Sequence, residues 1–393
     1  MGEKNLALKD YNQAIKLDPK FAGAYHNRGT VYSENGEKKL ALQDFNQAIE
    51  IDPKFAMAYY SRGRYYDEND GDKELALLNY NYAILLDYQS ALVYLNRGRI
   101  FQERGNKELA LQDYNHAIKL YPEEPLVYNN RGNVYRESGE KELALQDYNH
   151  AIKLDPKFAM AYNNRGILYR ESGEKELALL DYNHAIKLDP KFVMAYNSRG
   201  NLYTDKGEKE LALKDYNQAI RLNPQFANSY YNRGTLYLEN EEYELALQDY
   251  NHAIKLDPKD AITYNNRGAL YLEKGEKELA LKDFNQAIKF NPQYAKAYNN
   301  RGALYLEKGE KELALKDFNQ AIKFNPQFAH AYYNRGILYD DMGEKKSALK
   351  DFNQAILLNP KNANAYANRG ILYAQMNNLQ QAIQDLKTTA QLF

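Results

Sequence analysis

Apolar and small residues recur along this chain with a period of 34 residues. Within residues 295–328, Tyr298, Gly302 and Tyr305 are spaced by four and three positions, which places them on one face of a helix. Residues 313–322 carry a second helical pattern of leucine, alanine, phenylalanine and isoleucine, and Gly309 separates the two segments. Asn325-Pro326 follows, where proline ends a helix because it lacks an N–H group and restricts the residue before it. Each period therefore predicts two helices joined by a tight turn.

The same pattern fills the chain. Arg-Gly pairs follow one another at steps of 34 residues, apart from one step of 35 that results from an extra residue near Asp70. A fixed period of this length indicates stacked repeats, each contacting mainly its neighbours. We predict a single array over residues 1–393, with a half repeat at 1–21, full repeats at 22–55, 56–90, 91–124, 125–158, 159–192, 193–226, 227–260, 261–294, 295–328 and 329–362, and a terminal repeat at 363–393.

The pattern resembles the tetratricopeptide repeat family. With Ala295 as position 1 of a repeat, the small and large signature positions of that family are matched by Tyr298, Gly302, Tyr305, Ala314, Phe318, Ala321 and Pro326. The resemblance implies an all-α fold, an α-solenoid of helix–turn–helix repeats that forms a right-handed superhelix. It also implies that the first helices line a concave groove, and that the protein is an interaction scaffold binding an extended peptide segment of a partner there.

The composition argues against several other classes of function. The net charge is −1, so the chain has no field that would draw it onto nucleic acid or an anionic membrane. It contains no cysteine, and no apolar run approaches the roughly 20 residues of a membrane span. The first residues show no secretion signal, and we expect a cytoplasmic protein. Because the chain opens within a repeat, this sequence is also compatible with a fragment of a longer protein.

No residue set in the sequence carries catalytic chemistry. Four histidines, His116, His150, His184 and His252, share one position of the second helix where other repeats have glutamine. Neighbouring copies are expected about 10 Å apart, the usual spacing of packed helices, which is too far to share a zinc ion. The chain has no phosphate-binding loop of the G-x-x-x-x-G-K type and no convergent Ser, His and Asp set. We predict no catalytic residue, no metal, no cofactor and no enzymatic activity.

Two polar residues recur inside the predicted helices with great regularity. Arginine occupies position 7 in all eleven first helices, and aspartate occupies position 23 of the second helices with Asn79 as the exception. Asparagine and aspartate are mediocre helix formers, so a repeated partner must compensate. We hypothesise pairs such as Arg165 with Asp181 and Arg301 with Asp317, within a polar ladder that includes Asn319. The alternative is that these are unpaired surface residues copied by duplication.

Position 6 supplies the candidate peptide-binding residues. It resembles the asparagine ladder in the repeat arm of O-GlcNAc transferase, where side-chain amides hold the backbone of a peptide. An amide both donates and accepts, so it pairs with any sequence. Alternatively, these residues only hydrate the groove. The candidates are Asn96, Asn130, Asn164, Asn232, Asn266, Asn300 and Asn334.

Further candidate contacts come from positions 5, 9 and 12. Tyr60, Tyr231 and Tyr333 stand at position 5, outside the framework of recurring aromatic residues. Arg99, Arg136 and Arg170 stand at positions 9 and 12, with the alternative that they only balance nearby acidic residues.

A structural role without a dedicated peptide ligand stays open. Repeats 261–294 and 295–328 differ at only three positions, which indicates recent duplication or an engineered, consensus-like scaffold. The half repeat at 1–21 exposes a helix face, and no polar capping helix follows Phe393, although repeat arrays usually carry polar caps. Self-association through the chain ends into a superhelical rod is therefore the competing hypothesis.

Overall fold

The computed structural model describes residues 2–392, with Asp70 described by its backbone only. The described residues form an all-α solenoid of paired helices, without strands. No helix among them is long and apolar enough to cross a membrane. The chain divides into two compact parts, residues 1–202 and 203–393, and each part is described by itself.

Helices alternate along the chain in the order expected for two-helix repeats. Every first helix begins at the first residue of a repeat defined from the sequence. The first helices are α2 (Ala22–Glu34), α4 (Ala56–Tyr65), α6 (Ala91–Glu103), α8 (Pro125–Glu137), α10 (Ala159–Glu171), α12 (Val193–Asp205), α14 (Ala227–Glu239), α16 (Ala261–Glu273), α18 (Ala295–Glu307), α20 (Ala329–Asp341) and α22 (Ala363–Gln375). The second helices are α1 (Gly2–Leu17), α3 (Lys38–Ile51), α5 (Lys73–Leu85), α7 (Lys107–Leu120), α9 (Lys141–Leu154), α11 (Lys175–Leu188), α13 (Lys209–Leu222), α15 (Tyr243–Leu256), α17 (Lys277–Phe290), α19 (Lys311–Phe324), α21 (Lys345–Leu358) and α23 (Leu379–Leu392).

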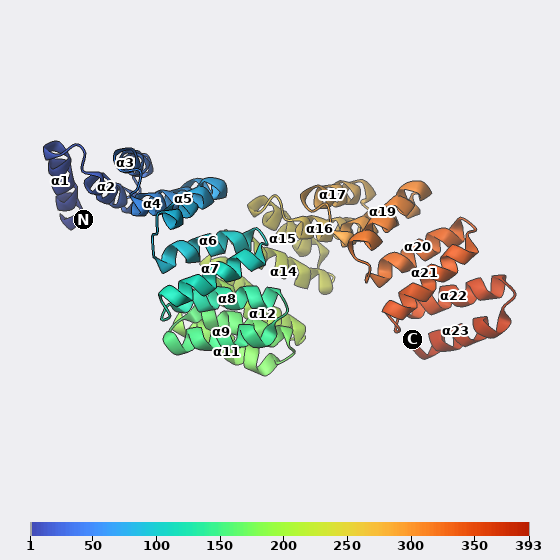
Figure 1. Ribbon diagram of the computed structural model, residues 1–393. Coiled ribbons are helices and arrows are strands. Elements are labelled where there is room, and N and C mark those ends of the chain that lie inside the picture. Colours follow the sequence, from blue (N-terminus) through green and yellow to red (C-terminus); the bar gives the residue numbers. More distant parts are fainter. Residues whose placement is uncertain (1, 393) are drawn as a thin grey trace. The chain divides into compact units, whose positions relative to one another are not determined.

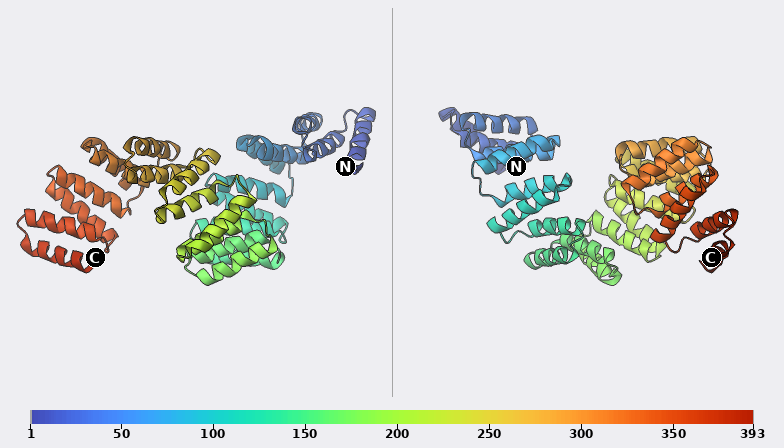
Figure 2. Two further views of the ribbon diagram at one scale, coloured as in Figure 1. Left: turned by 180° about the vertical axis from the view of Figure 1, so that it is seen from behind. Right: turned by 45° about the vertical axis from the view of Figure 1, so that its right-hand side comes forward.

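The helices stack in two layers within each part. A first helix packs against the second helix of its own repeat, and that second helix packs against the first helix of the next repeat. Figure 1 shows this stacking clearly for α20 to α23, and Figure 2 shows it from behind. First helices of successive repeats also touch, as α8 touches α10 and α18 touches α20, whereas no two second helices among the described residues make a comparable contact. The first helices are therefore the more closely spaced layer.

Glycine at position 8 allows the two helices of a repeat to touch. The ring of Phe318 on α19 is fully buried and lies against Gly302 on α18. A methyl group added at Gly302 would lie 2.8 Å from Cε1 of Phe318, closer than packed carbon atoms come. The recurring glycine is thus a packing requirement, because any side chain would push α18 away from α19.

Each helix end has a local cause. Gly309, with φ at 74°, follows α18 in the left-handed conformation that ends many helices. The residue after α19, Asn325, is extended, and its Oδ1 accepts a hydrogen bond from the N–H of Gln327 at 3.0 Å. This asparagine turn and Pro326 together prevent α19 from continuing.

The repeat at 56–90 absorbs its extra residue in a π-helix, η1 (Tyr66–Asp70), which directly continues α4. A π turn holds more residues than an α turn and accommodates a one-residue insertion. The same repeat lacks the closing proline, and α5 ends differently. The N–H groups of Asp87 and Tyr88 donate to the carbonyls of Ile84 and Ala83, both at 2.9 Å, and Asp87 is left-handed with φ at 60°.

Replacing Gly302 by alanine tests the close approach of α18 and α19. We expect Gly302→Ala to lower the free energy of unfolding by about 1–3 kcal/mol, because the core is overpacked there. Gly23→Ala is the control, since a methyl group at Gly23 meets only the side chain of Phe21, which is exposed. Urea denaturation followed by circular dichroism measures both, and a loss at Gly23 equal to that at Gly302 would contradict the packing argument.

Candidate functional site

Arg301 on α18 connects three helices. Its Nε and Nη2 donate to Oδ2 and Oδ1 of Asp317 on α19, at 2.7 and 2.8 Å. Its Nη1 donates to Oδ1 of Asn285 on α17, the second helix of the preceding repeat, at 2.6 Å. The rings of Tyr298 and Tyr305 lie 5.6 and 5.8 Å from the guanidinium carbon, within cation–π range. We call this arrangement the arginine clamp, because it holds one repeat against the one before it.

The arginine clamp recurs in both parts of the chain. Arg165 pairs with Asp181 and with Asn149 of the preceding repeat, and Asn319 accepts from Arg335 of the following repeat. Burial is the largest effect on the pKa of Arg301 and lowers it, but the hydrogen bonds and the charge of Asp317, with smaller effects of Tyr305 and Tyr298, together raise the pKa. In the irregular repeat, where Arg62 faces the neutral Asn79, burial prevails and the pKa of Arg62 is lowered.

A second set of hydrogen bonds, the amide ladder, joins successive first helices. The side chain at position 6 of one repeat donates to the side chain at position 5 of the repeat before it. A bond between neighbouring residues of one helix then connects these links into a continuous chain. In the C-terminal part the links, from donor to acceptor, are Asn334 Nδ2 to Asn299 Oδ1 (3.0 Å), Asn299 Nδ2 to Asn300 Oδ1 (3.4 Å), Asn300 Nδ2 to Asn265 Oδ1 (3.0 Å), Asn265 Nδ2 to Asn266 Oδ1 (3.3 Å) and Asn266 Nδ2 to Tyr231 OH (3.0 Å).

The N-terminal part contains links of the same kind and a defect at Asn163. Asn96 donates to the hydroxyl of Tyr60 at 3.3 Å, and Asn164 donates to Oδ1 of Asn129 at 2.9 Å. Oδ1 of Asn163 is buried and accepts no hydrogen bond from the described residues. Position 6 of the next repeat is Ser198, whose side chain is shorter than the asparagine found there in most repeats.

In several repeats the residues at positions 9 and 12 match the buried ring at position 24 in polarity. Tyr148 donates from its hydroxyl to Oδ1 of Asn133, at position 9, at 2.8 Å. Where the ring is Phe318, positions 9 and 12 are Ala303 and Leu306. Buried hydroxyls usually have a partner, which favours a polar neighbour beside tyrosine and permits an aliphatic one beside phenylalanine, although the buried hydroxyl of Tyr80 has no hydrogen-bond partner among the described residues. The corresponding pairs are Tyr114 with Gln102 (2.9 Å) and Tyr250 with Thr235 (3.2 Å).

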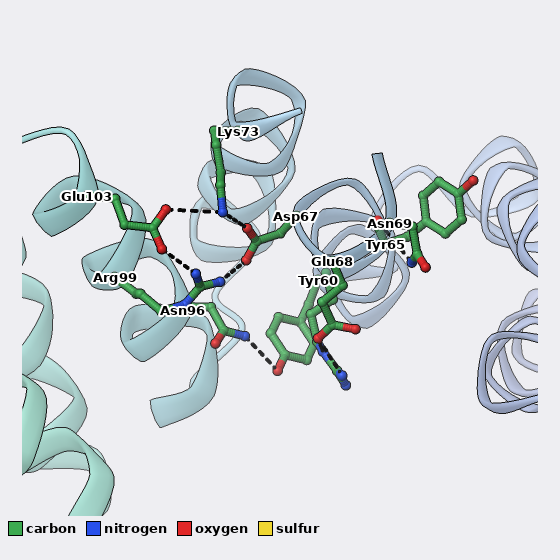
Figure 3. A network of polar contacts seen from close by, with 10 residues as sticks. Tyr60, Tyr65, Asp67, Glu68, Asn69, Lys73, Asn96, Arg99 and Glu103 are labelled. Atoms are coloured by element: carbon green, nitrogen blue, oxygen red, sulfur yellow. Dashed lines mark hydrogen bonds and ion pairs between the residues drawn. The ribbon is translucent and has the colours of Figure 1, made fainter. Parts of the chain in front are cut away.

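Arg99 lies in a compact charged network beside the π-helix (Figure 3). Its Nη1 donates to Oε1 of Glu103 at 2.6 Å, and its Nη2 pairs with Asp67, whose carboxylate is buried. Lys73 reaches both carboxylates, at 2.5 Å from Asp67 and 3.1 Å from Glu103. The charge of Arg99 is therefore compensated by acidic residues of the chain. This agrees with the alternative that Arg99 only balances nearby acidic residues.

Arg136 and the recurring histidines also have partners in the chain. Nη1 of Arg136 donates to Oε1 of Glu171 at 2.6 Å. The His116 ring packs against Tyr94 of its own repeat in a tilted arrangement, with ring centroids 4.1 Å apart. His150, His184 and His252 pack against the corresponding tyrosines at 4.2 to 4.3 Å. In the part of the chain that the structure describes, no three metal-ligating side chains of the His, Asp or Glu type gather at one place.

Family models described as tetratricopeptide repeats match most of the chain. They cover residues 1–36, 98–139, 132–173, 200–240, 234–275 and 270–309, also 22–55, 159–192, 295–328 and 329–362, and finally 352–384. The chain belongs to the tetratricopeptide repeat family. The matched residues leave out 56–97, where the irregular repeat lies. No curated protein is similar enough to match.

Solved structures of other repeat proteins are similar to the chain. The crystal structure of the APC/C hetero-tetramer Cut9–Hcn1 matches 100% of this chain and 90% of its own, at 15% identity and a TM-score of 0.56. Pseudomonas aeruginosa pilF matches over 51% of this chain and 92% of its own, at 21% identity and 0.47. MamA matches over 40% and 93%, at 25% identity and 0.36. The similarity to Cut9–Hcn1 supports the fold.

As a tetratricopeptide repeat protein, the chain has the architecture of a protein–protein interaction scaffold, and members of this family generally have no enzymatic activity. The structure places the predicted contact residues on the first helices. Tyr60 and Tyr231 accept ladder bonds from Asn96 and Asn266, and Tyr333 accepts one from Asn368 at 3.0 Å. Burial raises the pKa of all three hydroxyls. Sequence reasoning recognised position 6 but not that position 5 of the preceding repeat accepts from it.

Three of the predicted contact residues are two asparagines and one arginine that also lie on first helices. Asn130, Asn232 and Arg170 are all partly buried on their first helices. Contact between any of the predicted residues and a peptide stays a prediction.

Removing the carboxylate of the arginine clamp tests its contribution to stability. We expect Asp317→Ala to cost about 3 kcal/mol, because it leaves a half-buried guanidinium without its counter-charge. Asp317→Asn should cost less, since Asn79 accepts from Arg62 at 2.8 Å in the irregular repeat. Urea denaturation of both variants checks the order, and equal losses would show that a neutral hydrogen-bond acceptor at this position contributes nothing.

Adding the missing amide donor beside Asn163 should stabilise the protein. Ser198→Asn places a donor beside the buried Oδ1 of Asn163, and we expect a gain of about 1 kcal/mol in the free energy of unfolding. Ser61→Asn is the matched control, because Ser61 already forms a hydrogen bond with Nε2 of His26 at 2.9 Å. Thermal denaturation should show a higher midpoint for Ser198→Asn only. The same change of midpoint in both variants would contradict the claim that Asn163 lacks a hydrogen-bond donor.

Proposed function

We propose that this tetratricopeptide repeat protein holds an extended peptide segment of a partner protein against its first-helix layer. The observation that carries this proposal is the amide ladder. In the C-terminal part, Asn266, Asn300 and Asn334 at position 6 each use one of their two N–H groups on the preceding repeat, so one N–H and one lone pair of the carbonyl oxygen stay available. Because the ladder bonds fix the orientation of the amides, an incoming peptide finds donors and acceptors at a regular step.

The C-terminal part offers the best-ordered stretch of this surface. Asn266, Asn300 and Asn334 are partly exposed there and stand one repeat apart. Leu272 and Leu306 lie on the same helices at position 12 and are also partly exposed. Amides hold a peptide backbone without regard to sequence, and aliphatic neighbours add apolar contact, which together suit an extended segment.

Arginines have a smaller part in this proposal than the amides. Arg99 and Arg136 already pair with Glu103 and Glu171. Their remaining role is to hold the surface in place and to contact acidic peptide residues only where these displace an internal partner. We keep the cytoplasm as the proposed location of the scaffold and its partner.

A cysteine footprint tests the proposal, because the chain has no cysteine of its own. Matched pairs place one cysteine on each layer of a repeat: Leu92→Cys on α6 with Gln112→Cys on α7, and Lys296→Cys on α18 with Lys316→Cys on α19. All four positions are exposed. The probe is a set of 20-residue peptides selected on the wild-type chain from a random phage-displayed library. The rate of maleimide labelling is measured with and without saturating peptide.

We expect selected peptides to slow the labelling of one or both first-helix cysteines at least fivefold and to leave the second-helix cysteines unchanged. Protection of the second-helix cysteines instead, or failure to select any peptide, would contradict the proposal. Light scattering of the same samples measures the mass, and growth of the particle with concentration would favour the self-associating rod.

A further inference from the structure

A pocket of about 460 Å³ opens on the N-terminal part, beside the start of α6 and α8. Leu95 and Val127 form its floor and are buried, while Leu92 and Tyr121 at its mouth are 48% and 51% exposed. This volume is within the range of pockets that bind ligands in proteins. Leu92 and Leu95 occupy positions 2 and 5, so the pocket is continuous with the proposed peptide-binding layer.

A similar hollow of about 380 Å³ lies at the start of α2, between regular repeats, but two irregular junctions give the pocket at α6 a different lining. The linker before α6 follows the left-handed Asp87, without the usual proline, and contributes Tyr88 to the lining. Tyr121 stands where later repeats have an aspartate or asparagine that closes the turn. An example is Asp155, whose Oδ1 accepts from the N–H of Lys157 at 2.8 Å. Tyrosine forms no such turn, and its ring lines the pocket mouth instead.

The amide ladder is interrupted at the same place. Position 5 of this repeat is Leu95, which has no acceptor for the asparagine of the next repeat. Asn130 accepts from Asn129 at 3.2 Å, but its own Nδ2 donates to no group among the described residues. Asn130 does not line the pocket, but it lies on α8 three residues after Val127, which does.

The charge at the pocket is negative. Glu124 is the single charged residue among those that line it. Its Oε1 accepts from the N–H of Leu126 at 3.3 Å, which leaves the other carboxylate oxygen for an incoming cation. Glu123 is exposed beside it. A lysine or arginine is therefore the complementary neighbour of whatever apolar group enters.

From these features we infer that the pocket anchors a bulky apolar side chain of the bound peptide, with a lysine or arginine next to it. The Nδ2 of Asn130 donates to a backbone carbonyl of the same peptide. This inference rests on the proposed function, and it assigns the point where an otherwise sequence-tolerant surface selects its partner. The irregular repeat thus fixes the register of the peptide.

Fluorescence anisotropy with fluorescein-labelled members of the selected peptide set tests the anchor. The variants are Leu92→Lys, which gives position 2 the residue of Lys296, and Tyr121→Asp, which gives position 31 the residue of Asp155. Met194→Lys is the matched control at position 2 of a repeat without this pocket. All three replaced residues are exposed, and unchanged circular dichroism and urea midpoints check the fold.

We expect Leu92→Lys and Tyr121→Asp to weaken binding at least tenfold and Met194→Lys to leave it unchanged. Replacing the anchoring peptide residue by alanine should weaken binding to the wild-type chain to a similar extent. The same replacement should cause no further loss of affinity in the two variants, because they already lack the contact that it removes. Glu124→Gln should abolish the preference for lysine over glutamate next to the anchor.

The outcomes separate this inference from the function on which it rests. Peptides that protect a first-helix cysteine but bind all three variants like the wild type overturn the pocket and leave the function intact. The pocket is also overturned if the alanine peptide binds Leu92→Lys or Tyr121→Asp more weakly than the unsubstituted peptide does, because the two losses of affinity would then add. Absence of first-helix protection for every peptide overturns the function itself.

Discussion

The arginine clamp is the constraint on which the rest of the structure depends. A repeat protein has no global core, so every repeat must be positioned by its neighbours. Arg301 does this with one planar group, which meets Asp317 of its own repeat in two hydrogen bonds and Asn285 of the preceding repeat in a third. A guanidinium has a fixed fork geometry, so the clamp sets direction as well as distance.

The surface available to a ligand follows from this positioning. Once the second helices are clamped, the first helices come close enough for their position 5 and 6 side chains to form the amide ladder. The buried rings then decide what stands beside the ladder, since the hydroxyl of Tyr148 selects Asn133 and the ring of Phe318 permits Leu306. Core and surface are therefore coupled, and a change of one buried oxygen changes the polarity that a partner meets.

Sequence periodicity predicts the helices well because each depends on local signals such as Gly309 and Asn325-Pro326. The pairing of Arg301 with Asp317 also follows, since two poorly placed polar residues recur together. What the period does not reveal is which neighbouring repeat a side chain reaches. Asn319 bonds to Arg335, not Arg301, and Tyr231 accepts from Asn266 of the next repeat.

The structure of the irregular repeat could not be predicted from the period for a different reason. One extra residue near Asp70 becomes a π-helix, and only its three-dimensional course brings Asp67 to Arg99. The lining of the pocket at Leu95 combines two unusual junctions with a gap in the ladder. Such coincidences come from tertiary packing, which a single repeat does not encode.

Side-chain amide signals of the chain labelled with ¹⁵N at asparagine show directly whether the amide ladder binds a peptide. In each of Asn266, Asn300 and Asn334, one Nδ2 proton belongs to the ladder and the other is free for a ligand. We expect saturating peptide to shift one of the two proton signals of at least one of these amides. The signal of the proton that belongs to the ladder should not shift. Peptide binding that shifts neither proton of any of them would contradict it.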